Sequence, residues 1–157
     1  MGSGFGLWLA FVIGLVAGLR TMTAPAVVAW AVHLGWINLA GSHLAFMGSL
    51  WVAVLFSFCA LAEYVIDQLP STSARTDAAP LTSRIVMGLL TGACLGVAGG
   101  ISPAIGALLG ALGALAGAFG GYEARVRLVG WLRVPDAVIA VPEDLIAIGL
   151  GLLVVSR

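Results

Sequence analysis

Long apolar runs with almost no charged residue are the feature that most constrains this chain. Apolar residues make up 61% of the 157 residues, whereas charged residues make up only 9%. An ordinary soluble domain is about 45–50% apolar and about 25% charged, because its surface must be hydrated. The chain has too few charges to cover a soluble protein, which indicates an integral membrane protein whose main partner is the lipid bilayer.

Helices rather than a β-barrel are predicted to cross the bilayer. Barrel strands alternate apolar and polar residues over short segments, whereas the apolar runs here are continuous and rich in Ala, Leu and Gly. Six such runs follow one another, at residues 5–19, 24–37, 44–66, 85–101, 103–121 and 137–155. The predicted fold is all-α and polytopic, with about six hydrophobic helices in a single transmembrane domain at 1–157.

The runs differ in their ability to span a membrane. A full span needs about 20 residues, because each helical residue advances 1.5 Å across a hydrocarbon core of about 30 Å. The run at 44–66 satisfies this length, and those at 85–101 and 103–121 do so with small extensions. The first two runs are short and flank the polar segment GLRTMTAP at 18–25. They are predicted to form a re-entrant hairpin or a pair of thin spans.

The last run contains a proline followed by two acidic residues. Pro142 removes a backbone hydrogen bond, and Glu143 and Asp144 suit the first turn of a helix, where acidic side chains are favoured. We expect the last helix to be broken at Pro142. In the simplest interpretation the helix begins there, and residues 136–141 form a loop.

Arginines supply all seven basic residues and indicate the orientation of the chain. When six helices are threaded back and forth, only Arg157 falls on the side of the termini. The others are Arg20, Arg75, Arg84, Arg125, Arg127 and Arg133. Because basic loops stay cytoplasmic, both termini are predicted to be non-cytoplasmic in a multi-pass protein of the cell inner membrane.

Glycines in the fourth and fifth runs form one set of three and two pairs, and within each set their spacing is four residues. This spacing places small residues on one helix face and lets two backbones approach closely in lipid. The glycines are predicted either to pack helices within the bundle or to form a homo-oligomer seam of the glycine-zipper kind. They are Gly88, Gly92, Gly96, Gly106, Gly110, Gly113 and Gly117.

The chain divides into a first half at 1–69 and a second half at 84–157, joined by a polar cytoplasmic loop at 70–83. The segment VIGLVAG at 12–18 is similar to VMGLLTG at 86–92. With three helices in each half, the halves would be inverted relative to each other. Inverted repeats with broken helices are common in transporters, so the sequence suggests a 3+3 inverted repeat.

Polar side chains near helix ends form the candidate site. An ionised group at the centre of a membrane helix costs at least about 2.5–3.5 kcal/mol, so its position is informative. By the predicted topology, polar residues of separate helices reach one level in the cytoplasmic half, with Arg20 and Glu143 as a buried pair. The predicted substrate- or ion-binding residues are Arg20, Thr21, Thr23, Glu63, Asp67, Arg84, Glu143 and Asp144.

Three functions are consistent with such a cluster. In a transporter of a small solute, ion or lipid, Arg20 would bind an anionic group, and Glu63 and Glu143 would carry a coupling proton or cation. In a membrane enzyme acting on lipid headgroups, Asp67, Glu63 and Glu143 would bind a metal ion or act as acid and base. In a structural or assembly protein, the charges would only cap helices. We favour transport over catalysis and name no catalytic residue.

Cofactors and other partners have little basis in the sequence. No cofactor is predicted, although carboxylates would suit a proton, Na⁺ or Mg²⁺. His33 and His43 have no Cys or acidic residue at ligand spacing, which argues against a zinc site. Cys59 and Cys94 lie in apolar runs and are expected to act as small hydrophobic residues. The net charge is zero and no basic face is evident, which excludes a nucleic-acid partner.

Four motifs follow one another along nearly the whole chain. They are GLRTMTAP at 18–25, AEYVIDQLPSTSART at 62–76, GYEAR at 121–125 and PEDLIAI at 142–148. In this series the chain resembles the bacterial membrane-protein family called domain of unknown function 4126. The resemblance implies a helical membrane protein of similar length but no activity or substrate. It marks as motif positions Arg20, Glu63, Asp67, Arg75, Glu143 and Asp144.

Overall fold

The structure, a computed structural model, describes residues 3–67, 77–133 and 136–157. In these ranges the chain forms six α-helices and one short 3-10 helix, with no strand, which confirms the predicted all-α class. The elements are α1 (Ser3–Leu19), α2 (Thr23–His33), the 3-10 helix η1 (Ala45–Gly48), α3 (Leu50–Ile66), α4 (Ala78–Ala98), α5 (Pro103–Leu132) and α6 (Asp136–Val155).

Three of the helices are long and apolar enough to cross a membrane, namely α4, α5 and α6. The helices α1, α2 and α3 are apolar but shorter, with 17, 11 and 17 residues. Seventeen residues reach about 25 Å, which is less than a hydrocarbon core of about 30 Å. The chain therefore has the helices of a membrane protein, whereas six transmembrane helices and a re-entrant first hairpin stay predictions.

Two element boundaries differ from those predicted. The run at 44–66 does not give one long helix, because η1 forms first and α3 begins only at Leu50. The end of the predicted loop at 70–83 is helical, because α4 begins at Ala78. Pro80 lies in the first turn of α4, where a missing N–H removes no helical hydrogen bond. The earlier part of that loop lies outside the described residues.

The break expected at Pro142 is wrong, because α6 continues from Asp136 to Val155. A proline inside a helix removes one hydrogen bond, to the carbonyl group four positions earlier. Pro142 lies within the first two turns of α6 and is exposed, so its ring needs no space in a packed interior. The rest of the helix keeps its hydrogen bonds and continues.

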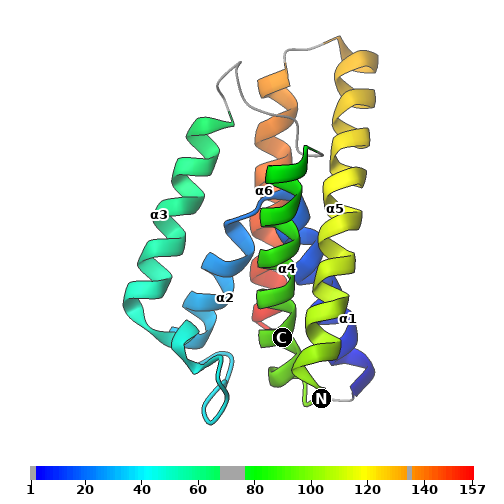
Figure 1. Ribbon diagram of the computed structural model, residues 1–157. Helices are drawn as coiled ribbons and strands as arrows, with labels where there is room; N and C mark the ends of the chain where they lie inside the picture. Colours follow the sequence, from blue (N-terminus) through cyan, green and yellow to red (C-terminus); the bar gives the residue numbers. More distant parts are fainter. Residues whose placement is uncertain (1–2, 68–76, 134–135) are drawn as a thin grey trace.

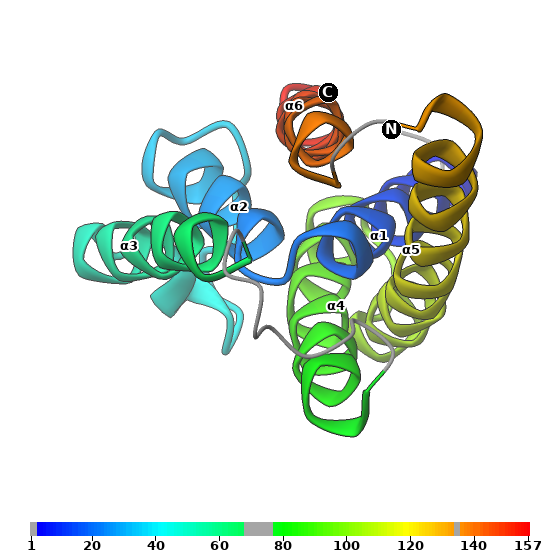
Figure 2. The ribbon, with the colours of Figure 1, turned by 90° about the horizontal axis from the view of Figure 1, so that it is seen from above.

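The helices α1, α4 and α5 form a tightly packed group, which we call the glycine group (Figures 1 and 2). Glycines make this packing possible. A Cβ atom at Gly110 of α5 would collide with the carbonyl oxygen of Gly88 in α4. A Cβ atom at Gly14 of α1 would collide with the carbonyl oxygen of Gly110. The three backbones therefore touch where no side chain separates them.

All the glycines predicted to form a packing face are buried against other helices of the same chain. Those of α4 contact α5, and those of α5 contact α4 or α1. Packing within the chain therefore accounts for the spacing of four. A homo-oligomer seam through the same glycines stays a prediction, and it would have to use backbone surfaces that this chain already covers.

The helices α2 and α3 form an antiparallel pair beside the glycine group, which we call the arm (Figure 1). The α2 backbone lies close to α1, α4 and α6, whereas the described α3 backbone lies close only to α2 and η1. Along α3 only Ala53 and Ala60 are buried, and large apolar residues such as Phe58 are exposed. The helix α3 is therefore attached to the rest of the molecule mainly through α2.

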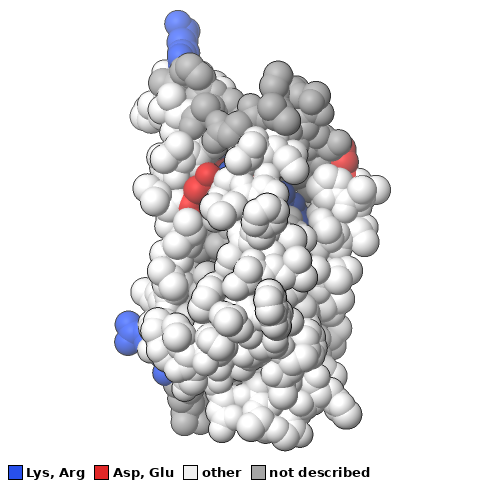
Figure 3. All heavy atoms as spheres, turned by 90° about the vertical axis from the view of Figure 1, so that its left-hand side faces the viewer, with Lys and Arg blue, Asp and Glu red and all other residues white. Residues whose placement is uncertain are grey.

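Both termini lie at one end of the molecule, as expected for an even number of antiparallel helices (Figure 1). The face formed by the arm shows a central surface without charged side chains, and its charges lie nearer the two ends (Figure 3). The halves of the chain are unlike each other, since α2 has 11 residues where an inverted repeat would match it with α5, which has 30. The repeat therefore stays a prediction.

Candidate functional site

The turn between α1 and α2, at residues 20–22, carries the centre of the site. Pro25 lies in the first turn of α2, and in one continuous helix its ring would collide with the carbonyl group of Thr21. The chain therefore turns, and backbone N–H groups at the start of α2 lose helical partners. Within a membrane, other groups of the protein must satisfy them.

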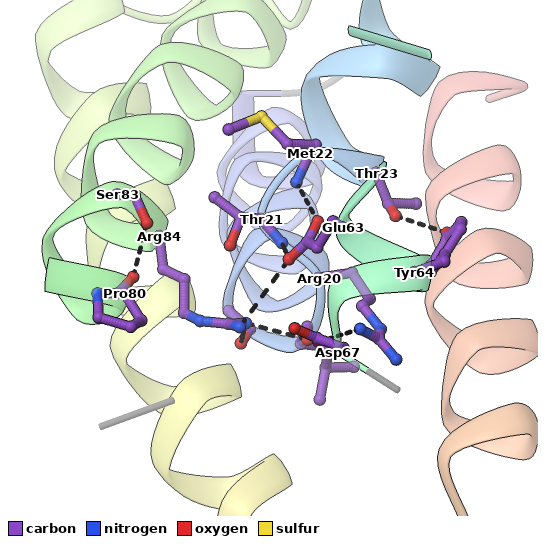
Figure 4. A network of polar contacts seen from close by, with 12 residues as sticks. Arg20, Thr21, Met22, Thr23, Glu63, Tyr64, Asp67, Pro80, Ser83 and Arg84 are labelled. Carbon is purple, nitrogen blue, oxygen red and sulfur yellow. Dashed lines mark hydrogen bonds and ion pairs between the residues drawn. The ribbon is translucent and has the colours of Figure 1, made fainter. Parts of the chain in front are cut away.

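Glu63 of α3 supplies these partners. Its two carboxylate oxygens each accept a hydrogen bond of 2.8 Å, one from the N–H of Thr21 and one from the N–H of Met22 (Figure 4). The positive end of the α2 dipole favours an anion at this position. Glu63 thus caps α2 from a different helix and fixes the end of α3 against the start of α2.

Arg20 links the arm to α6. Its side chain is 1% exposed, and its guanidinium group donates hydrogen bonds to Asp67 after α3 and to Asp144 of α6. Its Cζ atom also lies 5.2 Å from the ring centre of Tyr64, within cation–π range. The two carboxylates are 18% and 17% exposed. A buried cation is therefore paired with anions that keep some contact with the molecular surface.

Arg84 joins α4 to the same corner. Its Nη1 atom donates hydrogen bonds to the carbonyl oxygens of Gly18 and Leu19, at 2.6 Å and 3.0 Å. Its Nη2 atom lies 3.9 Å from Oε1 of Glu63 (Figure 4). A cation at the last turn of a helix balances the negative end of the helix dipole. Arg84 thus connects the end of α1 with the carboxylate that caps α2.

The neighbouring acids of α6 have different partners. Asp144 binds Arg20, whereas Oε2 of Glu143 lies 3.6 Å from Nη1 of Arg125 on α5. Consecutive helical residues point about 100° apart, so the two carboxylates face different neighbours. The predicted Arg20–Glu143 pair is therefore wrong by one residue, and Asp144 holds that position.

The helices α2 and α3 lie side by side, and two side-chain hydrogen bonds join them. The hydroxyl groups of Thr23 and Tyr64 lie 2.7 Å apart, and Nε1 of Trp30 donates to the hydroxyl group of Ser57 at 2.8 Å. On each helix the two bonds are about two turns, or about 10 Å, apart. Between them lies a pocket of about 290 Å³, formed by α2, α3 and α6.

The structure brings the predicted site residues to one place. We call the connected group at the corner the polar cluster. It consists of Asp144 and of five residues labelled in Figure 4, namely Arg20, Glu63, Tyr64, Asp67 and Arg84. Thr21 contributes its backbone N–H and Thr23 its hydroxyl group to Tyr64. Glu143 is the predicted residue whose ion pair points away from the cluster, toward α5.

Sequence reasoning missed two contributors, Tyr64 and Arg125. Tyr64 carries no charge whose cost in lipid would single it out, and Arg125 is one of the arginines that indicate the orientation of the chain. Their partners, Thr23 and Glu143, are distant in the sequence, and only the packing of α2 on α3 and of α5 near α6 identifies these pairs.

The described residues contain no group of three or more His, Cys, Asp or Glu side chains that could hold a metal ion. His33 instead lies 3.0 Å from the carbonyl oxygen of Gly48, and Cys59 and Cys94 are free thiols. The resemblance to domain of unknown function 4126 stays a prediction. Comparison of the chain with protein-family models, curated proteins and solved structures found no match.

Proposed function

We propose that this chain is a small multi-pass membrane protein that moves a small solute, ion or lipid across the bilayer through the polar cluster. The observation that carries the proposal is the position of Arg20. Its buried guanidinium group is held between Asp67 of the arm and Asp144 of α6. Burying a charge costs several kcal/mol unless it is paired, and here the pairing spans two parts of the molecule.

Exchange of partners at Arg20 would couple binding to movement of the arm. A proton on Asp67 removes one of the two negative charges that hold Arg20, and an anionic group of a substrate then takes its place. A proton on Glu63 similarly weakens the cap on α2 and the contact with Arg84. Because the described α3 backbone lies close only to α2 and η1, these protonations release the end of the arm from α1, α4 and α6. Asp67 and Glu63 are therefore the proposed proton carriers, and Asp144, in place of Glu143, is the partner of Arg20 on α6.

The proposed orientation places the polar cluster in the cytoplasmic half of the cell inner membrane, with both termini on the opposite side. Arginines support it, because basic segments stay cytoplasmic. Arg127 and Arg133 are exposed near the end of α5 that lies away from the termini (Figure 1). Labelling of cysteines introduced at the termini of the chain in intact cells tests this orientation.

Flux measurements in vesicles test the transport proposal. The purified chain is reconstituted with a pH-sensitive dye inside the vesicles and a fluorescent phospholipid in their membrane, and fluxes of protons, alkali cations, inorganic anions and lipid are followed. We expect at least one flux to exceed that of empty vesicles and to be lost in folded Arg20→Gln and Asp144→Asn variants. Arg157→Gln, at the other end of the molecule, serves as the control. Equal fluxes for the wild-type chain and Arg20→Gln contradict the proposal.

A structural role is the second candidate, and the hydrogen bonds that the polar cluster makes to the backbone of its own chain favour it. Glu63 accepts two backbone hydrogen bonds, and Arg84 donates to two backbone carbonyl groups. In this case the cluster only fastens the arm, so Arg20→Gln lowers stability while the wild-type chain produces no flux.

An enzyme that acts on lipid headgroups is not what the geometry favours. Glu63 binds backbone N–H groups, Asp67 binds Arg20, and Glu143 faces Arg125. A metal ion would need several of these carboxylates turned toward one point. Their present partners hold them in different directions.

A further inference from the structure

The pocket between α2, α3 and α6 points to a class of molecule that the chain binds. We infer that this pocket holds one acyl chain of a zwitterionic membrane phospholipid, whose headgroup lies at the polar cluster. The inference rests on the proposed function, since it names the substrate class of the same site. Three observations support the inference: the position of the pocket, the chemistry of its walls and the charges at one of its ends.

The pocket opens on the outside of the molecule, where lipid surrounds a membrane protein. Trp30 and Leu61 line it and are 36% and 63% exposed, so its mouth lies on the outer surface of the arm. Its volume of about 290 Å³ is near the lower end of the range for ligand pockets, about 300–1,000 Å³. One hydrocarbon chain therefore suits it better than a whole lipid.

The walls of the pocket favour hydrocarbon over water or a polar solute. The small side chains of Ala26 and Ala60 leave the space of the pocket, and Val27, Leu61 and Ile148 supply apolar surface. Its polar lining groups are the two pairs at its ends, Thr23 with Tyr64 and Trp30 with Ser57, which already bind each other. An apolar surface with no free polar partner favours contact with hydrocarbon over contact with water.

The charged residues at the Tyr64 end of the pocket indicate which polar headgroup the bound molecule carries. Tyr64 lines the pocket, and its ring also lies against the guanidinium group of Arg20. Arg20 is flanked there by Asp67 and Asp144, so charges of both signs lie side by side. A headgroup with a phosphate next to an ammonium group, as in phosphatidylethanolamine, complements this arrangement. Its ammonium faces the partly exposed carboxylates, and its phosphate reaches the buried Arg20 by taking the place of one of them.

Native mass spectrometry of the full chain in detergent, with added phosphatidylethanolamine, tests the inference. We expect one bound lipid on the wild-type chain, and at least tenfold weaker binding for Ala60→Phe, which fills the pocket. Val65 of α3 is 67% exposed, so Val65→Phe places the same ring on the outer surface. This control variant should bind the lipid as the wild-type chain does. Equal binding by Ala60→Phe and Val65→Phe overturns the inference.

A second measurement does not depend on the folding of Ala60→Phe. In a chain whose only tryptophan is Trp30, phosphatidylethanolamine with brominated acyl chains should quench Trp30 fluorescence at a low, saturable lipid fraction. Quenching that only rises in proportion to the lipid fraction overturns the inference. Phosphatidylglycerol with the same chains should bind at least fivefold more weakly, and equal affinity overturns the assignment of the headgroup. Both measurements are made without flux, so they can fail while the proposed transport holds, and transport can fail while lipid binding holds.

Discussion

The glycine group and the arm hold their helices together by different means. In the glycine group, backbones of α1, α4 and α5 touch where glycines remove every intervening side chain. In the arm, α3 buries only Ala53 and Ala60, and side-chain hydrogen bonds and ion pairs at its end connect it to the corner after α1.

This difference follows from the weakness of hydrophobic association in lipid. Lipid tails are as apolar as the helices, so close packing and hydrogen bonds have to hold membrane helices together. Close packing of backbones cannot be adjusted without separating the helices, whereas a carboxylate can exchange its partner or accept a proton. The chain thus combines a part suited to stay fixed with a part suited to be released.

Removal of the buried cation Arg20 should weaken the attachment of the arm most and cause the largest loss of stability. Arg20→Gln leaves Asp67 and Asp144 without their cation, and breaking a buried ion pair costs about 3–5 kcal/mol of unfolding free energy. Unfolding of the chain by denaturing detergent in mixed micelles measures the loss. The triple variant Arg20→Met, Asp67→Asn, Asp144→Asn removes all three charges together and should recover most of the stability. A triple variant less stable than Arg20→Gln contradicts this account.

A single added methyl group should disrupt the packing of the glycine group and lower the stability of the chain. Gly110→Ala places a Cβ atom against the backbone of α4, which cannot move aside as a side chain can. Overpacking of this kind costs about 1–3 kcal/mol of unfolding free energy. Gly120→Ala is the matched control on the same helix, because no described atom of another helix lies within 4 Å of its added Cβ. The control should leave stability unchanged or raise it by about 0.5–1 kcal/mol, and equal losses at both positions would refute the packing argument.

Neutralising the cap on α2 should have an intermediate effect. Glu63→Gln keeps one carbonyl acceptor but loses the second acceptor and the charge that faces Arg84, which we expect to cost about 1–2 kcal/mol. Glu123→Gln is the control, because among the described residues that exposed carboxylate forms an ion pair only with Arg127 four residues later on the same helix, and exposed pairs contribute about 0–1 kcal/mol. Thermal unfolding in lipid nanodiscs compares the two variants. A larger loss for Glu123→Gln would mean that the cap does not hold the arm.

Composition and spacing predicted much of the fold, because these features act locally or through simple repetition. The excess of apolar residues indicated membrane helices, and the spacing of four predicted the face on which Gly88 and Gly110 now meet. The same reasoning failed at Pro142, where an exposed position in an early turn allows the helix to continue. The cost of a proline depends on its surroundings, which the sequence does not display.

The candidate site was predicted as a set of residues but not as a set of pairs. The cost of charge in lipid singled out Arg20, Glu63 and Asp144 one by one. Which acid of α6 faces Arg20 depends on the rotation of that helix about its axis, and one residue of error changes the direction by about 100°. The partnership of Thr23 with Tyr64 depends on the antiparallel register of α2 and α3, for which the sequence carries no signal that we could identify.

The smallest expected effect is that of Tyr64→Phe, which separates the hydrogen bond between α2 and α3 from the contact with Arg20. Tyr64→Phe removes the hydroxyl group that binds Thr23 but keeps the ring against Arg20. A single hydrogen bond contributes about 0.5–1.5 kcal/mol, so the loss of unfolding free energy should be less than that of Arg20→Gln. Hydrogen exchange should nevertheless become faster in the first turn of α2 and in the last turn of α3, because the joint between them is weakened there. Trp30→Phe breaks the other joint, with Ser57, and should speed exchange in the last turn of α2 and near the middle of α3. If both variants change exchange along the whole arm equally, the two joints act as one unit, and the end of α3 cannot be released alone.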